Sequence, residues 1–279
     1  MLHLGLFVGV AVLRGQIILH VGLPKAASTY LQNIVFPGIP DVVYVHKSHN
    51  KSSLGVVRSL RRHCRDGSST VRSVLDEIPE SIQGALSSGR KVLVSDENLC
   101  MSSMAVWEKT GCRPIEFAER AHELAEALGV DVRIAYVGRK LESWLPSRYA
   151  QSAPRFENPG QSDFEERVLE IVQLYKDMPA LEWLREEAVL EAFNGRGNRL
   201  QVATTTVEQM RNDPMGAINQ LLAEMGVKRF VVDPEQDNAV ERINQRQRNQ
   251  GWVLRGGTHK IKMTEELERH ISGVQAGGE

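Results

Sequence analysis

QIILHVGLPKAASTYLQ, residues 16–32, is the stretch that decides the fold. Its apolar part, residues 17–21, lacks period-two alternation, so it predicts a strand buried on both faces of a parallel sheet. A short loop carrying Lys25 follows, and Ser28-Thr29 is a typical start for a helix. Unpaired N–H groups at a helix N-terminus, a lysine and two hydroxyls together favour an anion, and phosphate is the natural occupant.

The loop matches neither of two familiar phosphate-binding patterns. Walker A needs four residues between its first glycine and a Gly-Lys-Ser/Thr end, whereas here Lys25 follows Gly22 by three and no glycine directly precedes it. The GxGxxG pattern is also missing. An ordinary strand-to-helix turn with a solvent-exposed lysine therefore remains the alternative interpretation.

The rest of the chain predicts one three-layer α/β domain, residues 1–279, with helices flanking a central parallel sheet. Apolar runs predict further strands at residues 42–45, 92–94, 132–137 and 200–203. One helical pattern ends at Gly129, and another begins at Asp213-Pro214 and stops at Gly226. Residues 155–163 are expected to form a surface loop or lid, and residues 1–15 a disordered or strand extension.

A second candidate anion-binding element follows the strand at residues 132–137. Arg139 lies just past that strand, where open α/β sheets place their ligands, and Ser147 is about two turns into the next predicted helix. Arginine offers a bidentate fork for phosphate, and serine offers one more hydrogen bond. A surface arginine and a water-facing serine remain the alternative.

Taken together, Pro-Lys-x-x-Ser-Thr after a first strand and Arg with Ser at +8 after a later strand resemble the PAPS-dependent sulfotransferase family. Residues 92–99, VLVSDENL, and the segment from Asn212 to Gly226 also resemble parts of it. The resemblance implies a P-loop NTPase-like sulfotransferase fold and the donor PAPS (3′-phosphoadenosine 5′-phosphosulfate), with PAP as product. It implies that the first loop binds the 5′-phosphosulfate through Lys25, Ala26, Ala27, Ser28, Thr29 and Tyr30.

In the family, the arginine and serine of the second motif hold the 3′-phosphate, which places Arg139 and Ser147 there. Residues 241–248, ERINQRQR, resemble a tail that closes over the nucleotide in some members, so residues 233–279 are expected to be a closing tail with Arg242 and Trp252 at the cofactor. Ala27 departs from the family, which usually has glycine there. Because alanine resists positive φ, the loop is expected to use an ordinary backbone conformation at Ala27.

The implied reaction needs a cation at the bridging oxygen and a base for the acceptor. Lys25 suits the first role. Glu97, just past residues 92–94, is the favoured base, His46 is the runner-up, and His49 and Asp96 are further options. A structural carboxylate is the alternative interpretation of Glu97. No metal is expected, since the sequence has no HxH, DxD or HExxH cluster.

Composition limits the setting and the partners. A net charge of -1 argues against a nucleic-acid coat, and three cysteines without CxxC spacing fit a reducing, cytoplasmic compartment. The apolar N-terminus is far shorter than the ~20 residues of a spanning helix, so no membrane partner is expected, and a weak export signal or a membrane-associating end is the alternative interpretation. The acceptor is expected to be a small molecule or glycan bound by residues 47–65, 100–115 and 152–165, and a homodimer stays open. A kinase-like phosphotransferase and a non-catalytic nucleotide-binding protein are the competing functions.

Overall fold

The structure is a computed structural model that describes residues 15–194, 196, 198–227 and 251–275. Five of its strands form one parallel sheet in the order β2-β3-β1-β4-β5. They are β1 (Gln16–Gly22), β2 (Val42–His46), β3 (Lys91–Ser95), β4 (Asp131–Gly138) and β5 (Leu200–Thr206). The five predicted strands are confirmed, each somewhat longer than its apolar run.

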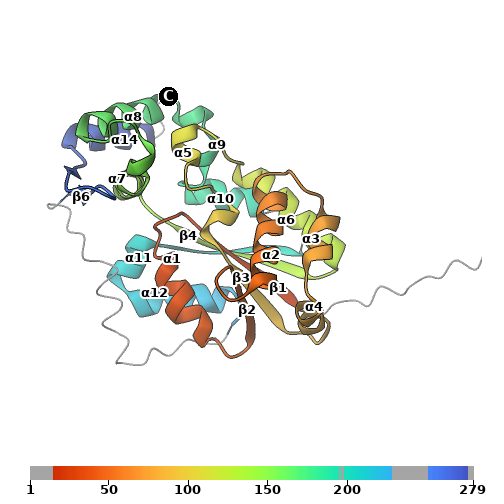
Figure 1. Ribbon diagram of the computed structural model, residues 1–279. Helices are drawn as coiled ribbons and strands as arrows, with labels where there is room; N and C mark the ends of the chain where they lie inside the picture. Colours follow the sequence, from red (N-terminus) through yellow and green to blue (C-terminus); the bar gives the residue numbers. More distant parts are fainter. Residues whose placement is uncertain (1–14, 195, 197, 228–250, 276–279) are drawn as a thin grey trace, which may run out of the picture.

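Helices flank this sheet, so the predicted three-layer α/β architecture is confirmed (Figure 1). One side carries α2 (Lys51–Leu60), α3 (Val71–Glu77) and α6 (Pro114–Leu128). The other carries α1 (Ser28–Tyr30), α11 (Val207–Asn212) and α12 (Pro214–Glu224). Other short helices are α4 (Glu80–Ser87), α5 (Ala105–Glu108), α9 (Pro179–Glu182) and α10 (Glu186–Phe193).

A third group of elements packs together beyond the ends of β1 and β4. It contains α7 (Leu141–Ser152), α8 (Gln161–Gln173), α14 (Glu265–Gln275) and the hairpin of β6 (Trp252–Val253) and β7 (Lys260–Ile261). The predicted loop at residues 155–163 is therefore shorter than expected, because its last residues already belong to α8. None of the described helices is both long and apolar enough to span a bilayer.

The predicted helix boundaries follow from local chemistry. α6 ends where Gly129 adopts left-handed backbone, at φ 65°. The Asp213 side chain caps α12 by accepting a hydrogen bond from the Gly216 N–H at 2.9 Å, just ahead of Pro214. The sequence predicted both ends.

Strand order determines where a ligand can bind. The connection out of β1 leads to β2, on the β3 side of the sheet, while the connection out of β4 leads to β5 on the opposite side. The two strands are direct neighbours and end together, with Gly22 paired to Val137. The crevice past these two ends is the topological switch point, the usual ligand site of an open α/β sheet.

Candidate functional site

The loop at residues 23–27, between β1 and α1, uses left-handed backbone at two residues that are not glycine. Lys25 has φ 73° and Ala27 has φ 56°. The Ala26 N–H donates to the Leu23 carbonyl (2.9 Å), and the Tyr30 N–H donates to the Ala27 carbonyl (3.0 Å). The expectation of ordinary backbone at Ala27 is wrong. The chain leaves a buried strand and enters a helix within five residues, which requires this tight turn, and a methyl group tolerates it at a cost of about 1 kcal/mol.

This loop presents polar groups to one side of the sheet edge. Alternating backbone conformations of this kind turn successive N–H groups into a concavity that suits an anion. The side chains of Lys25 and Thr29 are exposed there, while those of Ser28 and Tyr30 are buried. α1 does begin at Ser28 as predicted, but after Tyr30 the chain continues as a π-helical turn, η1 (Leu31–Val35).

The second predicted element lies directly against this loop. Arg139 follows β4, and its Nη1 donates to the Lys25 carbonyl at 2.6 Å. Its other nitrogens donate to Ser143, Nε to the hydroxyl (3.0 Å) and Nη2 to the carbonyl (2.9 Å). The guanidinium therefore bridges the first turn of α7 and the loop after β1.

Helix α7 is also fixed to the loop by a tryptophan. The Trp144 side chain is fully buried, and its Nε1 donates to the Pro24 carbonyl at 2.9 Å. That contact assigns Trp144 to the support of the loop, not to stacking on a base. Ser147 lies three residues further along α7 and is buried as well. The structure thus brings Lys25, Arg139 and the helix that carries Ser147 together at the switch point.

Two further predicted cofactor residues lie in or near the C-terminal segment. Trp252, in β6, is buried, and its hairpin contacts α7, where the Arg255 N–H donates to the Ala150 carbonyl at 2.8 Å. The hairpin therefore lies beside the helix that carries Ser147. Arg242 lies outside the described residues.

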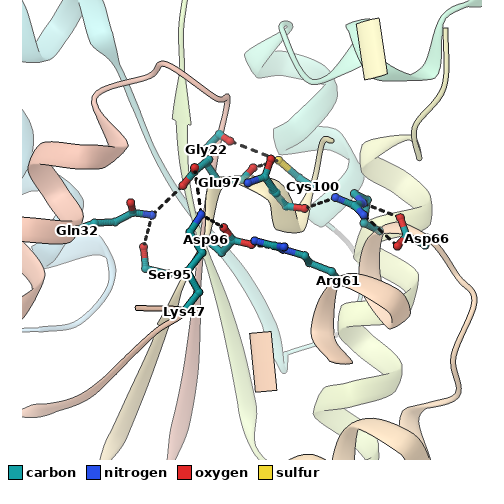
Figure 2. A network of polar contacts seen from close by, with 11 residues as sticks. Gly22, Gln32, Lys47, Arg61, Asp66, Ser95, Asp96, Glu97 and Cys100 are labelled. Atoms are coloured by element: carbon teal, nitrogen blue, oxygen red, sulfur yellow. Dashed lines mark hydrogen bonds and ion pairs between the residues drawn. The ribbon is translucent and has the colours of Figure 1, made fainter. Parts of the chain in front are cut away.

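Glu97 lies just past the end of β3, the strand next to β1, and belongs to the polar network in Figure 2. Its carboxylate accepts a hydrogen bond from Gln32 Nε2 (3.0 Å) and lies 3.5 Å from Lys47 Nζ. Burial would raise the pKa of Glu97, but the charge of Lys47 and the Gln32 hydrogen bond outweigh it, so the pKa lies below its ordinary value. Glu97 is therefore an ionised carboxylate near neutral pH.

Asp96 is a structural anchor in the same network. Its side chain has no exposed surface, and it pairs with Arg61 and, at 3.1 Å, with Lys47 (Figure 2). Burial raises its pKa, yet Arg61 and Lys47 lower it further, so the net pKa is below the ordinary value. Asp96 holds Lys47 beside Glu97, and both of its carboxylate oxygens are engaged by the two cations.

His46, the runner-up base, ends β2 and is buried. Its Nδ1 lies 2.8 Å from the Ser48 hydroxyl, and its buried Nε2 has no hydrogen-bond partner among the described residues. Burial, together with the charge of Lys47, lowers its pKa, so the ring is neutral at pH 7. His49 is exposed and packs edge-on against the His46 ring.

Two buried polar residues of this site were not found from the sequence. His20 is fully buried in β1, and its Nδ1 lies 2.7 Å from the Ser95 hydroxyl. Gln32 Nε2 donates to Ser95 (3.2 Å) as well as to Glu97, and the Ser95 hydroxyl can donate to the His20 ring or accept from it, depending on the tautomer of the ring. The signal in the sequence was a lone histidine inside an otherwise apolar strand, which indicates a buried partner.

No cluster of three or more potential metal ligands occurs in the part of the chain that the structure describes. The three cysteines are free and buried. Burial raises the pKa of Cys64 and of Cys112 to about 12, and that of Cys100 well above its ordinary value. The thiols are therefore protonated and poor nucleophiles.

No protein-family model matches this chain, and no curated protein matches it either. Several solved structures are similar. A sulfotransferase from Alicyclobacillus acidocaldarius is 13% identical with a TM-score of 0.41, and the match covers 81% of this chain and 89% of that one. Mouse sulfotransferase SULT7A1, solved with PAP, is 12% identical with a TM-score of 0.42, covering 90% and 72%.

The sulfotransferase domain from the curacin biosynthetic pathway is 14% identical with a TM-score of 0.41, covering 94% of this chain and 98% of that domain. All three proteins are sulfotransferases, the family that the two sequence motifs resemble.

Proposed function

We propose that this protein is a sulfotransferase that moves a sulfuryl group from PAPS to a hydroxyl or amine of a carbohydrate or small-molecule acceptor. The observation that carries the proposal is the hydrogen bond from the Arg139 guanidinium to the Lys25 carbonyl. It joins the two elements that the resemblance to sulfotransferases assigns to the two phosphate-bearing ends of one nucleotide. Both lie at the switch point, where β1 and β4 end side by side.

The donor-binding roles follow from the chemistry of each group. The loop N–H groups of residues 25–30, apart from those of Ala26 and Tyr30, which donate within the loop, hold the 5′-phosphosulfate together with the hydroxyls of Ser28 and Thr29. Arg139 and Ser147 hold the 3′-phosphate, and Arg242 and Trp252 cover the nucleotide from the C-terminal segment. Charged side chains and backbone donors neutralise the ligand, so the proposal includes no metal.

Transfer is a displacement at sulfur. The acceptor oxygen forms a bond to sulfur while the bond from sulfur to the bridging oxygen of PAPS breaks, and PAP leaves with the electron pair. The Lys25 ammonium offsets the charge that grows on that bridging oxygen. The acceptor's proton passes to a base at the end of a neighbouring strand.

Two groups are available in the basic form at pH 7. Glu97 is an ionised carboxylate whose position is set by Gln32 and Lys47. His46 is a neutral imidazole with a buried, unpartnered Nε2 among the described residues. We favour Glu97, because its carboxylate is partly exposed whereas His46 is buried. Glu97→Gln and His46→Gln, compared at equal donor binding, separate the two assignments.

Thermal unfolding with PAP, ATP and ADP side by side tests the donor. A ligand at a hundred times its dissociation constant stabilises a protein by about 2.7 kcal/mol. At equal concentrations, PAP should stabilise the protein far more than ATP or ADP does. Lys25→Ala and Arg139→Lys should each reduce the thermal shift caused by PAP. The first substitution removes the ammonium group, and the second replaces the bidentate guanidinium fork by a lysine. Arg72→Ala, which removes an exposed arginine of α3, is the charge control.

Sulfate transfer from PAPS to a panel of hydroxyl and amine acceptors, followed by mass spectrometry, tests the reaction. PAP binding without transfer to any acceptor would favour a non-catalytic nucleotide-binding protein. A preference for ATP over PAP would favour a kinase-like phosphotransferase and would overturn the proposal.

A further inference from the structure

Two arginines at the end of α7 converge on a single serine. Arg148, the residue after Ser147, is only 2% exposed, and its guanidinium donates to the Ser103 carbonyl and to the Gln151 side chain. Arg155, at the end of η5 (Ala153–Arg155), is exposed and donates to the Ser103 hydroxyl at 3.4 Å. Ser103 thus lies between an inner and an outer guanidinium.

These two positive charges have no acidic partner in the described part of the chain, where no ion pair joins Arg148 or Arg155 to a carboxylate. Burial and the charge of Arg155 lower the pKa of Arg148 to about 10, against a raising effect of Glu97, and the guanidinium still stays protonated at pH 7. A buried guanidinium satisfied only by neutral oxygens is costly, and a bound anion would offset that cost.

The arginine pair is connected to the proposed base by sequence and by charge. Ser103 follows η4 (Glu97–Leu99), the turn that carries the favoured base, and Glu97 is close enough for its charge to act on Arg148. Ser103 and Arg155 also belong to two segments, residues 100–115 and 152–165, that are expected to bind the acceptor. Trp144 of α7 and Arg139, just before α7, connect this region to the loop at residues 23–27.

We propose that Arg148 and Arg155, together with Ser103, bind an anionic group of the acceptor, so that the acceptor is an acidic molecule. The exposed guanidinium fork of Arg155 suits a carboxylate or a sulfate held in two hydrogen bonds, and the buried Arg148 adds its positive charge from below. The acceptor then presents its hydroxyl to the base near Glu97 and its anionic group to the arginines. This inference rests on the proposed sulfotransferase function and names the chemical class of its acceptor.

Matched pairs of sugars test the inference without any need for turnover. Calorimetric titrations of the full chain, with and without saturating PAP, compare D-glucuronate with D-glucose, and N-acetylglucosamine 6-sulfate with N-acetylglucosamine. The acidic member of at least one pair should bind roughly tenfold tighter or more, since hydrogen bonds to a charged group are the strong ones. The first pair reports a carboxylate and the second a sulfate.

Arg155→Gln decides the outcome, because its side chain is exposed and its loss should leave folding intact. It should abolish most of the preference for the acidic sugar, and Arg155→Lys should retain part of it. Arg148→Gln should act in the same direction where it folds. Arg72→Gln, in an exposed pair with Asp76 on α3, should leave the preference unchanged.

Equal binding within both pairs, no binding of either member, or an unchanged preference in Arg155→Gln would each overturn the inference. The failure of the proposed function looks different. A protein that prefers the acidic sugars through Arg155 but does not bind PAP would overturn the proposed donor and leave the anion site in place. A protein that binds PAP but shows no preference would overturn only the acidic acceptor.

Discussion

The indole N–H of Trp144 donates a hydrogen bond to the carbonyl oxygen of Pro24 at 2.9 Å, across 120 residues of sequence. The contact fixes α7 against the loop after β1. It is buried from solvent, where a carbonyl without a hydrogen-bond donor would be costly. It makes the loop's conformation depend on a residue that does not touch the ligand in the proposed function.

Trp144→Phe should therefore weaken both folding and donor binding. We expect the free energy of unfolding to fall by roughly 1–3 kcal/mol, because the Pro24 carbonyl loses its donor. PAP affinity should fall as well, because the loop is no longer held against α7. Urea unfolding and a PAP titration measure the two effects.

Trp183→Phe is the matched control for this change. Trp183 is equally buried, and its Nε1 donates to the Cys112 carbonyl at 2.9 Å, away from the loop. It should lose similar stability but keep wild-type PAP affinity. Equal losses of PAP affinity in both variants would show that general destabilisation, and not the loop, is responsible.

Ala27 stores backbone strain in the same loop, since its φ is 56°. Ala27→Gly should be neutral or raise the free energy of unfolding by up to about 1 kcal/mol, because glycine adopts this conformation without penalty. Ala27→Val should lower it by about 1–2 kcal/mol, because a branched side chain tolerates positive φ worst. Urea unfolding of both variants gives the two numbers.

The control for Ala27 lies inside a helix. Ala85 is buried in α4, where glycine should lower the free energy of unfolding by about 1 kcal/mol, the opposite sign. A destabilising Ala27→Gly of that same size would show that residue 27 is not strained.

Gln32 is a positioning residue for the proposed base, since its amide donates to both Glu97 and Ser95. Its hydrogen bond helps to hold the pKa of Glu97 below the ordinary value. Gln32→Met removes the donor at similar volume, so the pKa of Glu97 should rise. A base must be deprotonated, so the acid limb of the kcat/KM profile should move to higher pH.

A second variant shows whether a change in the kcat/KM profile of Gln32→Met comes from Glu97 or from a general loss of stability. Gln83→Met removes a side-chain donor that bonds the Ile78 carbonyl at 2.9 Å, outside the site, and should leave the profile in place. An acid limb that does not move in Gln32→Met would speak for His46 as the base, since Gln32 makes no hydrogen bond to that ring among those described.

The sequence predicted the sheet because its strands are short, continuous apolar runs rich in valine and isoleucine, a pattern typical of strands covered on both faces. It also predicted that Lys25 and Arg139 each lie just past a strand, since each follows an apolar run, but the adjacency of those two strands comes from the sheet order. It failed at Ala27, where residue type opposed a backbone conformation that the turn requires. It also missed Gln32, Lys47 and Arg148, whose partners lie far away in sequence, so that no local pattern connects them.

Because the His20 ring is buried, the free energy of unfolding should be lower in mild acid than at neutral pH. Burial lowers its pKa from 6.5 to about 4, so between these pH values the unfolded chain binds a proton that the folded chain does not. The contribution of His20 to stability is complete above pH 6.5 and decreases as the pH falls toward 4. The full difference corresponds to roughly 3 kcal/mol.

His20→Gln should flatten that dependence, because glutamine can still hydrogen-bond to Ser95 but does not titrate. The measurement is the free energy of urea unfolding at several pH values between 4.5 and 7 for wild type, His20→Gln and His270→Gln. His270 is exposed on α14, so its replacement should keep the wild-type slope. An unchanged slope in His20→Gln would mean that burial does not lower the pKa of His20 in the folded state.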